Sequence, residues 1–146
     1  MKNVLIVDDE RLIRTSLAEW LRLYDKTCNV LTAGNGREAV DILETALVDI
    51  VITDLDMPVM DGLELLAYRQ EHCSDVPAIV ITSFVDSDIR ERLFRLGACT
   101  YMPKPFGFKE LHTKILQLLE ARIHPYDICR GSLGYANAMI EEDMIC

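Results

Sequence analysis

The chain has 146 residues, half of them hydrophobic, and carries a formal net charge of −9 at pH 7. This length fits one domain with a substantial core, and the acidity without a Lys/Arg-rich block argues against direct nucleic-acid binding by this chain. The N-terminal apolar run is too short for a signal peptide, no run reaches the roughly 18 residues of a membrane span, and the five cysteines have no zinc-site spacing. We therefore expect a cytoplasmic protein without a membrane or zinc role.

Short β-like runs alternate along the chain with segments of helical periodicity. Strands are expected at residues 3–7, 28–33, 50–53, 78–81 and 100–102. The first, third and fourth are nearly continuous Val, Ile and Leu, which is typical of strands covered on both faces. Helices are expected near residues 12–24, 39–47, 62–72, 86–96 and 111–119. Asp86, Ser87 and Asp88 each offer an N-cap to the fourth helix, and Gly97 offers a C-cap.

This repetition predicts right-handed βαβ units in a three-layer α/β domain with a parallel sheet over residues 1–122. Ligands of such sheets bind outside the carboxyl ends of the strands. Asp8 and Asp9 follow the first strand, Asp54 the third, Thr82 the fourth and Lys104 the fifth. The second strand, which this kind of fold places at the margin, has no such residue at its end.

The chemistry of this set is that of phosphoryl transfer. Three neighbouring carboxylates repel one another unless a cation or protons intervene, and an oxygen-rich site of this kind suits Mg²⁺. With the metal bound, the Asp54 carboxylate can attack a phosphoryl group. Lys104 can then neutralise phosphoryl oxygens, and the Thr82 hydroxyl can donate a hydrogen bond to another.

Four motifs carry a resemblance to a known family. IVDDE at 6–10, DLDMPVMDG at 54–62, VITS at 80–83 and YMPKPF at 101–106 together resemble the receiver domain of two-component response regulators. The motifs occur in order, and the resemblance covers about five-sixths of the chain. It implies a flavodoxin-like receiver fold with five parallel strands in the order 2-1-3-4-5.

The resemblance also implies a metal site and a phosphoacceptor. Asp54 matches the phosphoacceptor, Asp9 looks like the direct ligand of Mg²⁺, and Asp8 looks like the acid that holds metal-bound water. The backbone carbonyl of Asp56 matches a third protein ligand of the metal, and Mn²⁺ can replace Mg²⁺. The side chains of Asp56 and Phe84 would flank the phosphoryl group and influence its lifetime.

Further roles carried over from the family concern the switch. Thr82 is similar to the switch hydroxyl, Lys104 to the phosphate-binding lysine, and Tyr101 to the aromatic residue whose rotamer reports activation. The Lys104–Pro105 peptide looks like the family's cis bond. Phosphorylation would change the face made by the fourth helix, the fifth strand and the fifth helix.

Partners are expected from the same resemblance. They are a sensor histidine kinase or a phosphotransfer protein upstream, an output domain or protein downstream, and a homodimer through the switching face. The chain would not be an enzyme beyond its own phosphorylation and dephosphorylation. Residues 123–146 are too few for a usual DNA-binding output domain. A docking tail, a short dimerisation helix and the start of a longer output region all remain open for them.

Other interpretations of these residues also remain open. Asp8, Asp9 and Glu10 could be N-caps and first-turn acids that the helix dipole favours. Asp54 and Asp56 could be loop acids, Lys104 a solvated turn lysine and Tyr101 a core residue. A metal-dependent phosphatase with an aspartyl nucleophile and a receiver-like interaction module without phosphorylation are the alternative functions.

Overall fold

The computed structural model describes residues 1–121 and consists of five strands and five helices in strict alternation. The strands are β1 (Lys2–Val7), β2 (Cys28–Ala33), β3 (Ile50–Asp54), β4 (Ala78–Thr82) and β5 (Thr100–Pro103). The helices are α1 (Arg11–Tyr24), α2 (Gly36–Thr45), α3 (Gly62–His72), α4 (Ser87–Arg95) and α5 (Phe108–Ala121). All ten expected elements are present; the tail expected at 123–146 lies outside the described residues.

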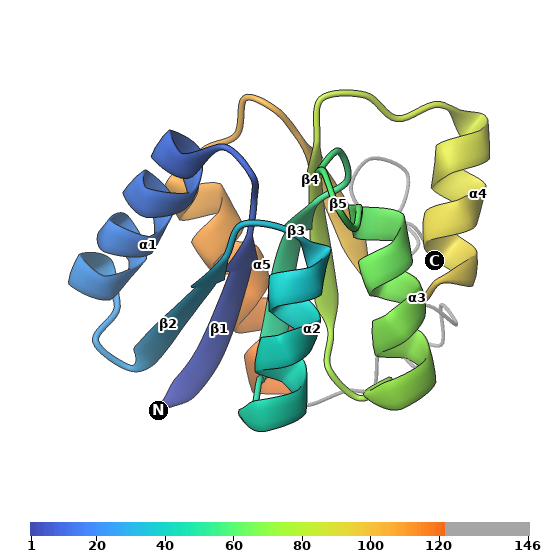
Figure 1. Cartoon of the computed structure of the whole chain (residues 1–146). Helices are drawn as coiled ribbons and strands as arrows, with labels where there is room; N and C mark the ends of the chain where they lie inside the picture. Colours follow the sequence, from blue (N-terminus) through green and yellow to red (C-terminus); the bar gives the residue numbers. More distant parts are fainter. Residues whose placement is uncertain (122–146) are drawn as a thin grey trace.

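The five strands form one parallel sheet in the order β2-β1-β3-β4-β5. This confirms the three-layer α/β receiver fold and its expected strand order. In the register of the sheet, Val7 lies opposite Thr53, and Asp54 lies opposite Ile81. The carboxyl ends of the strands therefore reach one edge, and the loops that follow β1, β3, β4 and β5 lie along it (Figure 1).

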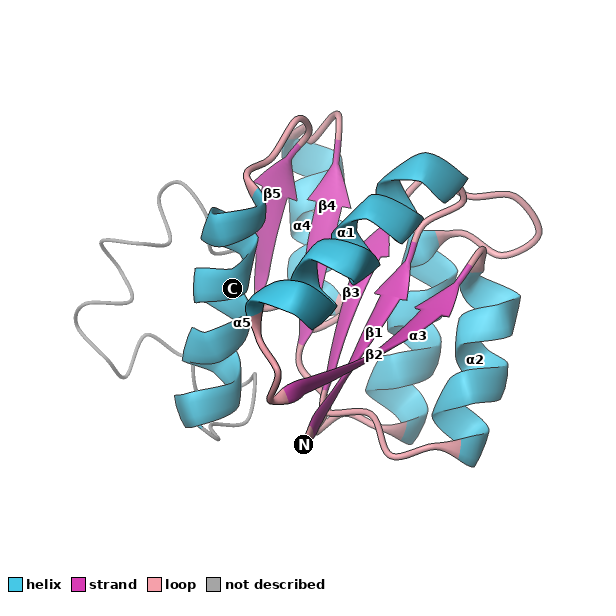
Figure 2. Ribbon diagram, turned by 90° about the vertical axis from the view of Figure 1, so that its left-hand side faces the viewer, coloured by secondary structure: helices cyan, strands magenta, loops and turns pink. Residues whose placement is uncertain are grey.

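Each face of the sheet has its own hydrophobic core. Helices α1 and α5 cover one face, and α2, α3 and α4 cover the other (Figure 2). Alternate residues of each central strand enter opposite cores, because successive side chains of a strand point to opposite faces. In β1, Val4 and Ile6 join the α1/α5 core, whereas Leu5 and Val7 join the other.

Local sequence explains where most helices begin and end. The side chains of Asn35, Asp61 and Asp86 each accept a hydrogen bond from the amide three residues further along, as N-caps do. Gly97 follows α4 with a φ of 77°, a conformation that favours glycine. Of the three N-cap candidates for α4, the structure uses Asp86, while Ser87 and Asp88 lie within the helix, and the capping role expected for Gly97 is confirmed. Leu47, expected within the second helical segment, lies beyond α2 and is 87% exposed.

A buried arginine connects α3 with the ends of its neighbours. Arg69 is 2% exposed. Its guanidinium donates hydrogen bonds to the carbonyls of Val76 (2.8 Å) and Leu96 (2.7 Å). The amide of Gln70 donates to the carbonyl of Arg95 at 2.8 Å. The C-terminal end of α4 is therefore fixed to α3 through two consecutive residues of that helix.

None of the helices within residues 1–121 combines the length and the apolar character that crossing a bilayer requires.

Candidate functional site

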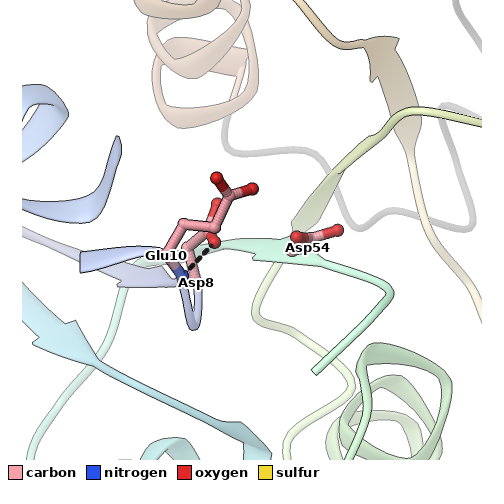
Figure 3. A group of neighbouring side chains, drawn as sticks. All are labelled: Asp8, Glu10 and Asp54. Carbon is pink, nitrogen blue, oxygen red and sulfur yellow. Dashed lines mark hydrogen bonds between the residues drawn. The ribbon is translucent and has the colours of Figure 1, made fainter. Parts of the chain in front are cut away.

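Two buried aspartates and a lysine meet at the carboxyl edge of the sheet. Asp8 follows β1 and Asp54 ends β3, and each is only 5% exposed. Lys104 follows β5, and its Nζ donates to Oδ2 of Asp54 at 2.8 Å and to Oδ2 of Asp8 at 3.4 Å. The same Nζ lies 3.4 Å from Oε1 of Glu10. Asp8, Glu10 and Asp54 face a common space (Figure 3).

Burial and charge shift the pKa values of this group. Burial alone would lower the pKa of Lys104, but the hydrogen bond and charge of Asp54, together with Asp8, raise it above its usual value. Burial raises the pKa of Asp8, and the amide of Glu10 and the charge of Lys104 only partly offset this effect. One ammonium thus balances several carboxylates, and the site retains an excess of negative charge.

Close backbone contacts hold Asp54 in place. A Cβ atom on Gly62 would lie 2.2 Å from the carbonyl oxygen of Asp54, so only glycine allows α3 to start this close to β3. The amide of Gly62 donates to the carbonyl of Leu55 at 2.9 Å, and the amide of Asp56 donates to Oδ1 of Asp54 at 3.3 Å. The loop therefore fixes both the backbone and the carboxylate of Asp54.

The ends of β4 and β5 are joined at the site. The amide of Lys104 donates to the carbonyl of Thr82 at 2.9 Å, and the Lys104–Pro105 peptide is cis, as expected. The buried Thr82 hydroxyl donates to the carbonyl of Phe84 at 3.2 Å and accepts from its amide at 3.4 Å. Tyr101 is half-buried against the core under α2, α3 and α4. The Thr82 hydroxyl is thus held by long, weak bonds.

The structure brings together three of the expected residues, Asp8, Asp54 and Lys104. Asp9 is exposed and lies outside the group of carboxylates identified within residues 1–121. Glu10 belongs to that group, although sequence reasoning treated it only as an acid at a helix start. The third acid of the IVDDE run was the available signal, but the sequence does not fix the direction of its side chain.

The donor set fits a hard divalent cation. Asp8, Glu10 and Asp54 each offer one carboxylate oxygen, and these oxygens lie within 4.8 Å of one another. Mg²⁺ prefers oxygen ligands and commonly uses one or two carboxylates together with water. The excess negative charge beside Lys104 would favour such an ion.

An apolar groove adjoins the site on the α1 side. It has a volume of about 480 Å³ and is lined by Leu12, Ile13, Ser16, Lys104, Pro105, Phe106 and Phe108. Leu12, expected on the helical face of α1, is 79% exposed here. The lysine of the site thus lies directly beside an apolar surface.

Comparison with known proteins identifies the class. Residues 4–116 match the family model of the response regulator receiver domain, so the chain belongs to this family. This match confirms the assignment to the receiver domain of two-component systems that the sequence motifs suggested. Receiver domains generally use Mg²⁺ at their acidic pocket, and the cluster of Asp8, Glu10 and Asp54 is compatible with binding such an ion.

Individual relatives agree with this assignment. The chain is 37% identical over 150 residues to the probable transcriptional regulator ycf27 of Cyanidium caldarium, covering 98% of this chain and 59% of the relative. It is 35% identical over 140 residues to the transcriptional regulatory protein PdtaR of Mycobacterium tuberculosis, covering 96% and 67%. The chain thus spans about three-fifths to two-thirds of the length of these curated relatives.

Solved structures show the same fold. A CheY-like receiver domain protein from Methanospirillum hungatei superposes with a TM-score of 0.79 at 25% identity, covering 84% of this chain and 96% of that one. The response regulator TrrA from Thermotoga maritima, in complex with Mg²⁺ and BeF, superposes with a TM-score of 0.71 at 36% identity. That match covers 82% of this chain and all of the other.

Proposed function

We propose that this receiver domain accepts a phosphoryl group on Asp54 and that the modification changes the surface formed by α4, β5 and α5. The observation that carries the proposal is the 2.8 Å contact between Lys104 and Asp54, beside the second buried carboxylate, that of Asp8. A buried aspartate whose carboxylate contacts an ammonium group and lies near further acids is suited to act as the nucleophile in phosphoryl transfer. The TrrA complex with Mg²⁺ and BeF supports the proposal by likeness.

In the proposed transfer, an oxygen of Asp54 forms the bond to phosphorus while the bond from phosphorus to the donor breaks. The leaving group of the donor departs with the electron pair of the broken bond. Lys104 neutralises oxygens of the phosphoryl group, and the hydroxyl of Thr82 turns from Phe84 to donate to another oxygen. Asp8, Asp9, Asp54 and the carbonyl of Asp56 would hold Mg²⁺ or Mn²⁺, which supplies further charge neutralisation when bound.

The energy available is comparable to what a switch requires. Aspartyl phosphorylation adds about −1.5 to −2 units of charge and three acceptor oxygens. If Thr82 and Lys104 each gain a charge-assisted bond of roughly 1.5–3 kcal/mol, the total is at most about 3–6 kcal/mol, because Lys104 already contacts Asp54 and Thr82 gives up its bonds to Phe84. Inverting a 1:99 equilibrium requires roughly 5.5 kcal/mol. We therefore expect a population shift in which Thr82 moves toward the phosphoryl group and Tyr101 turns inward.

The proposed partners follow from the same function. A sensor histidine kinase or a phosphotransfer protein would supply the phosphoryl group, and an output domain or protein would read the changed surface, which could also form a homodimer. The apolar groove beside Lys104 supports a protein donor, because a small phosphodonor requires no apolar contact. We propose residues 1–122 as the receiver unit, with catalysis limited to its own phosphorylation and dephosphorylation.

Intact-mass measurement tests the proposal directly. The parent chain and Asp54→Asn are incubated with Mg²⁺ and a small-molecule phosphodonor. We expect one phosphoryl adduct on the parent and none on the variant, because the amide side chain of the variant lacks the nucleophilic carboxylate. If the parent gains no adduct and binds no beryllofluoride, phosphorylation is excluded and an interaction module without phosphorylation becomes the better interpretation.

A further inference from the structure

Glu10 reaches into the site, although neither the expected ligand set nor the start of α1 requires it. Its backbone occupies the N-cap position of α1, but its side chain makes no capping hydrogen bond. The carboxylate instead places Oε1 3.4 Å from Nζ of Lys104. Figure 3 shows the side chains of Glu10 and Asp8 next to each other, with Asp54 beside them on the neighbouring strand. The side chain is thus directed at the lysine and not at the helix amides.

The three carboxylates around Lys104 differ in exposure. The side chains of Asp8 and Asp54 are 7% and 6% exposed, whereas that of Glu10 is 58% exposed. An ammonium group has three N–H donors, one for each of the carboxylates of Asp8, Glu10 and Asp54. Glu10 therefore marks the solvent side of the lysine, and the two aspartates mark its buried side.

Lys104 and a divalent cation would compete for the same carboxylates. The ammonium already contacts Oδ2 of both Asp54 and Asp8. Two positive charges a few ångströms apart in a partly buried site repel each other strongly. The lysine must therefore withdraw when the cation binds, and withdrawal is costly if no anion remains for it. Glu10, already within 3.4 Å, offers such an anion.

We propose that Glu10 is a positioning residue that receives the ammonium of Lys104 when a divalent cation occupies Asp8 and Asp54, and that it thereby raises the affinity of the site for the cation. The inference rests on the proposed function, which requires the metal. The effect passes through Lys104 and does not require a bond between Glu10 and the metal.

A double-mutant cycle in the full chain tests this route. The dissociation constant for Mg²⁺ is measured from backbone amide shifts by NMR in the parent, Glu10→Gln, Lys104→Met and the double variant. Glu10→Gln should weaken Mg²⁺ binding about three- to fivefold in the parent, the size expected for a partly exposed ion pair. In the Lys104→Met background, the same change should alter binding by less than about twofold.

The other possible results of this experiment would each overturn the inference about Glu10. Equal weakening by Glu10→Gln in both backgrounds would overturn the inference, because Glu10 would then act on the metal directly. Mg²⁺ binding that does not respond to Glu10→Gln would overturn this inference alone. A parent that binds no Mg²⁺ would overturn the proposed function as well. Glu71→Gln, which makes the same change of charge on an exposed residue near the C-terminal end of α3, should leave binding unchanged.

Discussion

The hydroxyl of Thr82 lies at the end of β4, the strand that pairs with the strand ending in Asp54. Its two bonds to the backbone of Phe84 are 3.2 and 3.4 Å long, so exchanging them for a charge-assisted bond is favourable. In Thr82→Ala, we expect Asp54 to remain phosphorylatable while the response of Tyr101 weakens. About 1.5–3 kcal/mol of coupling would be lost, which lowers the equilibrium constant for the switched state by roughly tenfold or more.

The measurement compares NMR shifts of Tyr101 with and without beryllofluoride. Thr82→Ser is the matched control, because it keeps the hydroxyl and should keep most of the response. A full response of Tyr101 in Thr82→Ala would show that the coupling does not run through this hydroxyl.

At the scale of single residues, the sequence predicted which residues meet at the site better than it predicted the directions of their side chains. Asp8, Asp54 and Lys104 could be predicted to meet because they follow strands that end at one edge of a parallel sheet. The grouping of Glu10 rather than Asp9 with Asp8 and Asp54 depends on local turn geometry, in which Oδ1 of Asp8 accepts from the amide of Glu10 at 2.9 Å. Residue type alone does not determine that geometry.

Among the elements, α1 and α5 are joined by a polar contact within an aromatic cluster. Nε2 of His112 lies 2.8 Å from Oδ2 of Asp25, and its ring meets those of Trp20 and Tyr24 edge-on. The hydrogen bonds from His112 and Thr27 hold the pKa of Asp25 well below its usual range. The contact therefore stabilises the fold above the pKa of the unfolded carboxyl, about 3.9, and is lost as the pH falls below it toward the folded-state pKa.

Asp25→Asn should lower the free energy of unfolding by about 1 kcal/mol near neutral pH. The difference from the parent should shrink as the pH falls below about 4, because protonation of Asp25 in the unfolded chain then reduces the stability that this contact contributes in the parent. The free energies of unfolding of the parent and the variant are measured by urea denaturation, followed by the fluorescence of Trp20, the single tryptophan. Asp41→Asn, at a 61% exposed side chain paired with Arg37, should change little at any pH. A pH-independent difference for Asp25→Asn would contradict this account.

Arg69 makes a second contact between elements, one that involves a buried charge. Replacing it with Met removes the donors to the carbonyls of Val76 and Leu96, and unsatisfied buried carbonyls are costly. We expect Arg69→Met to lower the free energy of unfolding by about 2–4 kcal/mol, measured by urea denaturation. Arg37→Met, at a 64% exposed side chain, should cost less than about 0.5 kcal/mol. Similar losses for the two variants would show that burial of Arg69 is not the cause.

Strands and helices could be predicted where the pattern of hydrophobic residues was strong. The runs of β1, β3 and β4 identify strands covered on both faces, and both cores confirm it. The contacts of Arg69 and His112 were not predictable, because their partners lie up to 87 residues away and periodicity carries no information on such pairs. The strand order came from the family resemblance and not from the alternation of elements.

For the whole molecule, residues 1–121 contain both cores and every described residue of the site. A chain ending at residue 122 should therefore unfold cooperatively, with a free energy within about 1 kcal/mol of the full chain. It should also accept a phosphoryl group on Asp54. Circular dichroism during urea denaturation and intact mass measure the two properties. A non-cooperative transition would show that the receiver unit extends further along the chain.

The attachment of α4 has a consequence for how a signal leaves the molecule. Arg69 and Gln70 fix its C-terminal end to α3, whereas its N-terminal end follows the loop that begins after Thr82 and contains Phe84. A shift of that loop would tilt the helix about its fixed end, so displacement would grow toward Ser87. A binding protein that contacts the first turn of α4 would sense a larger change than one that contacts the last turn.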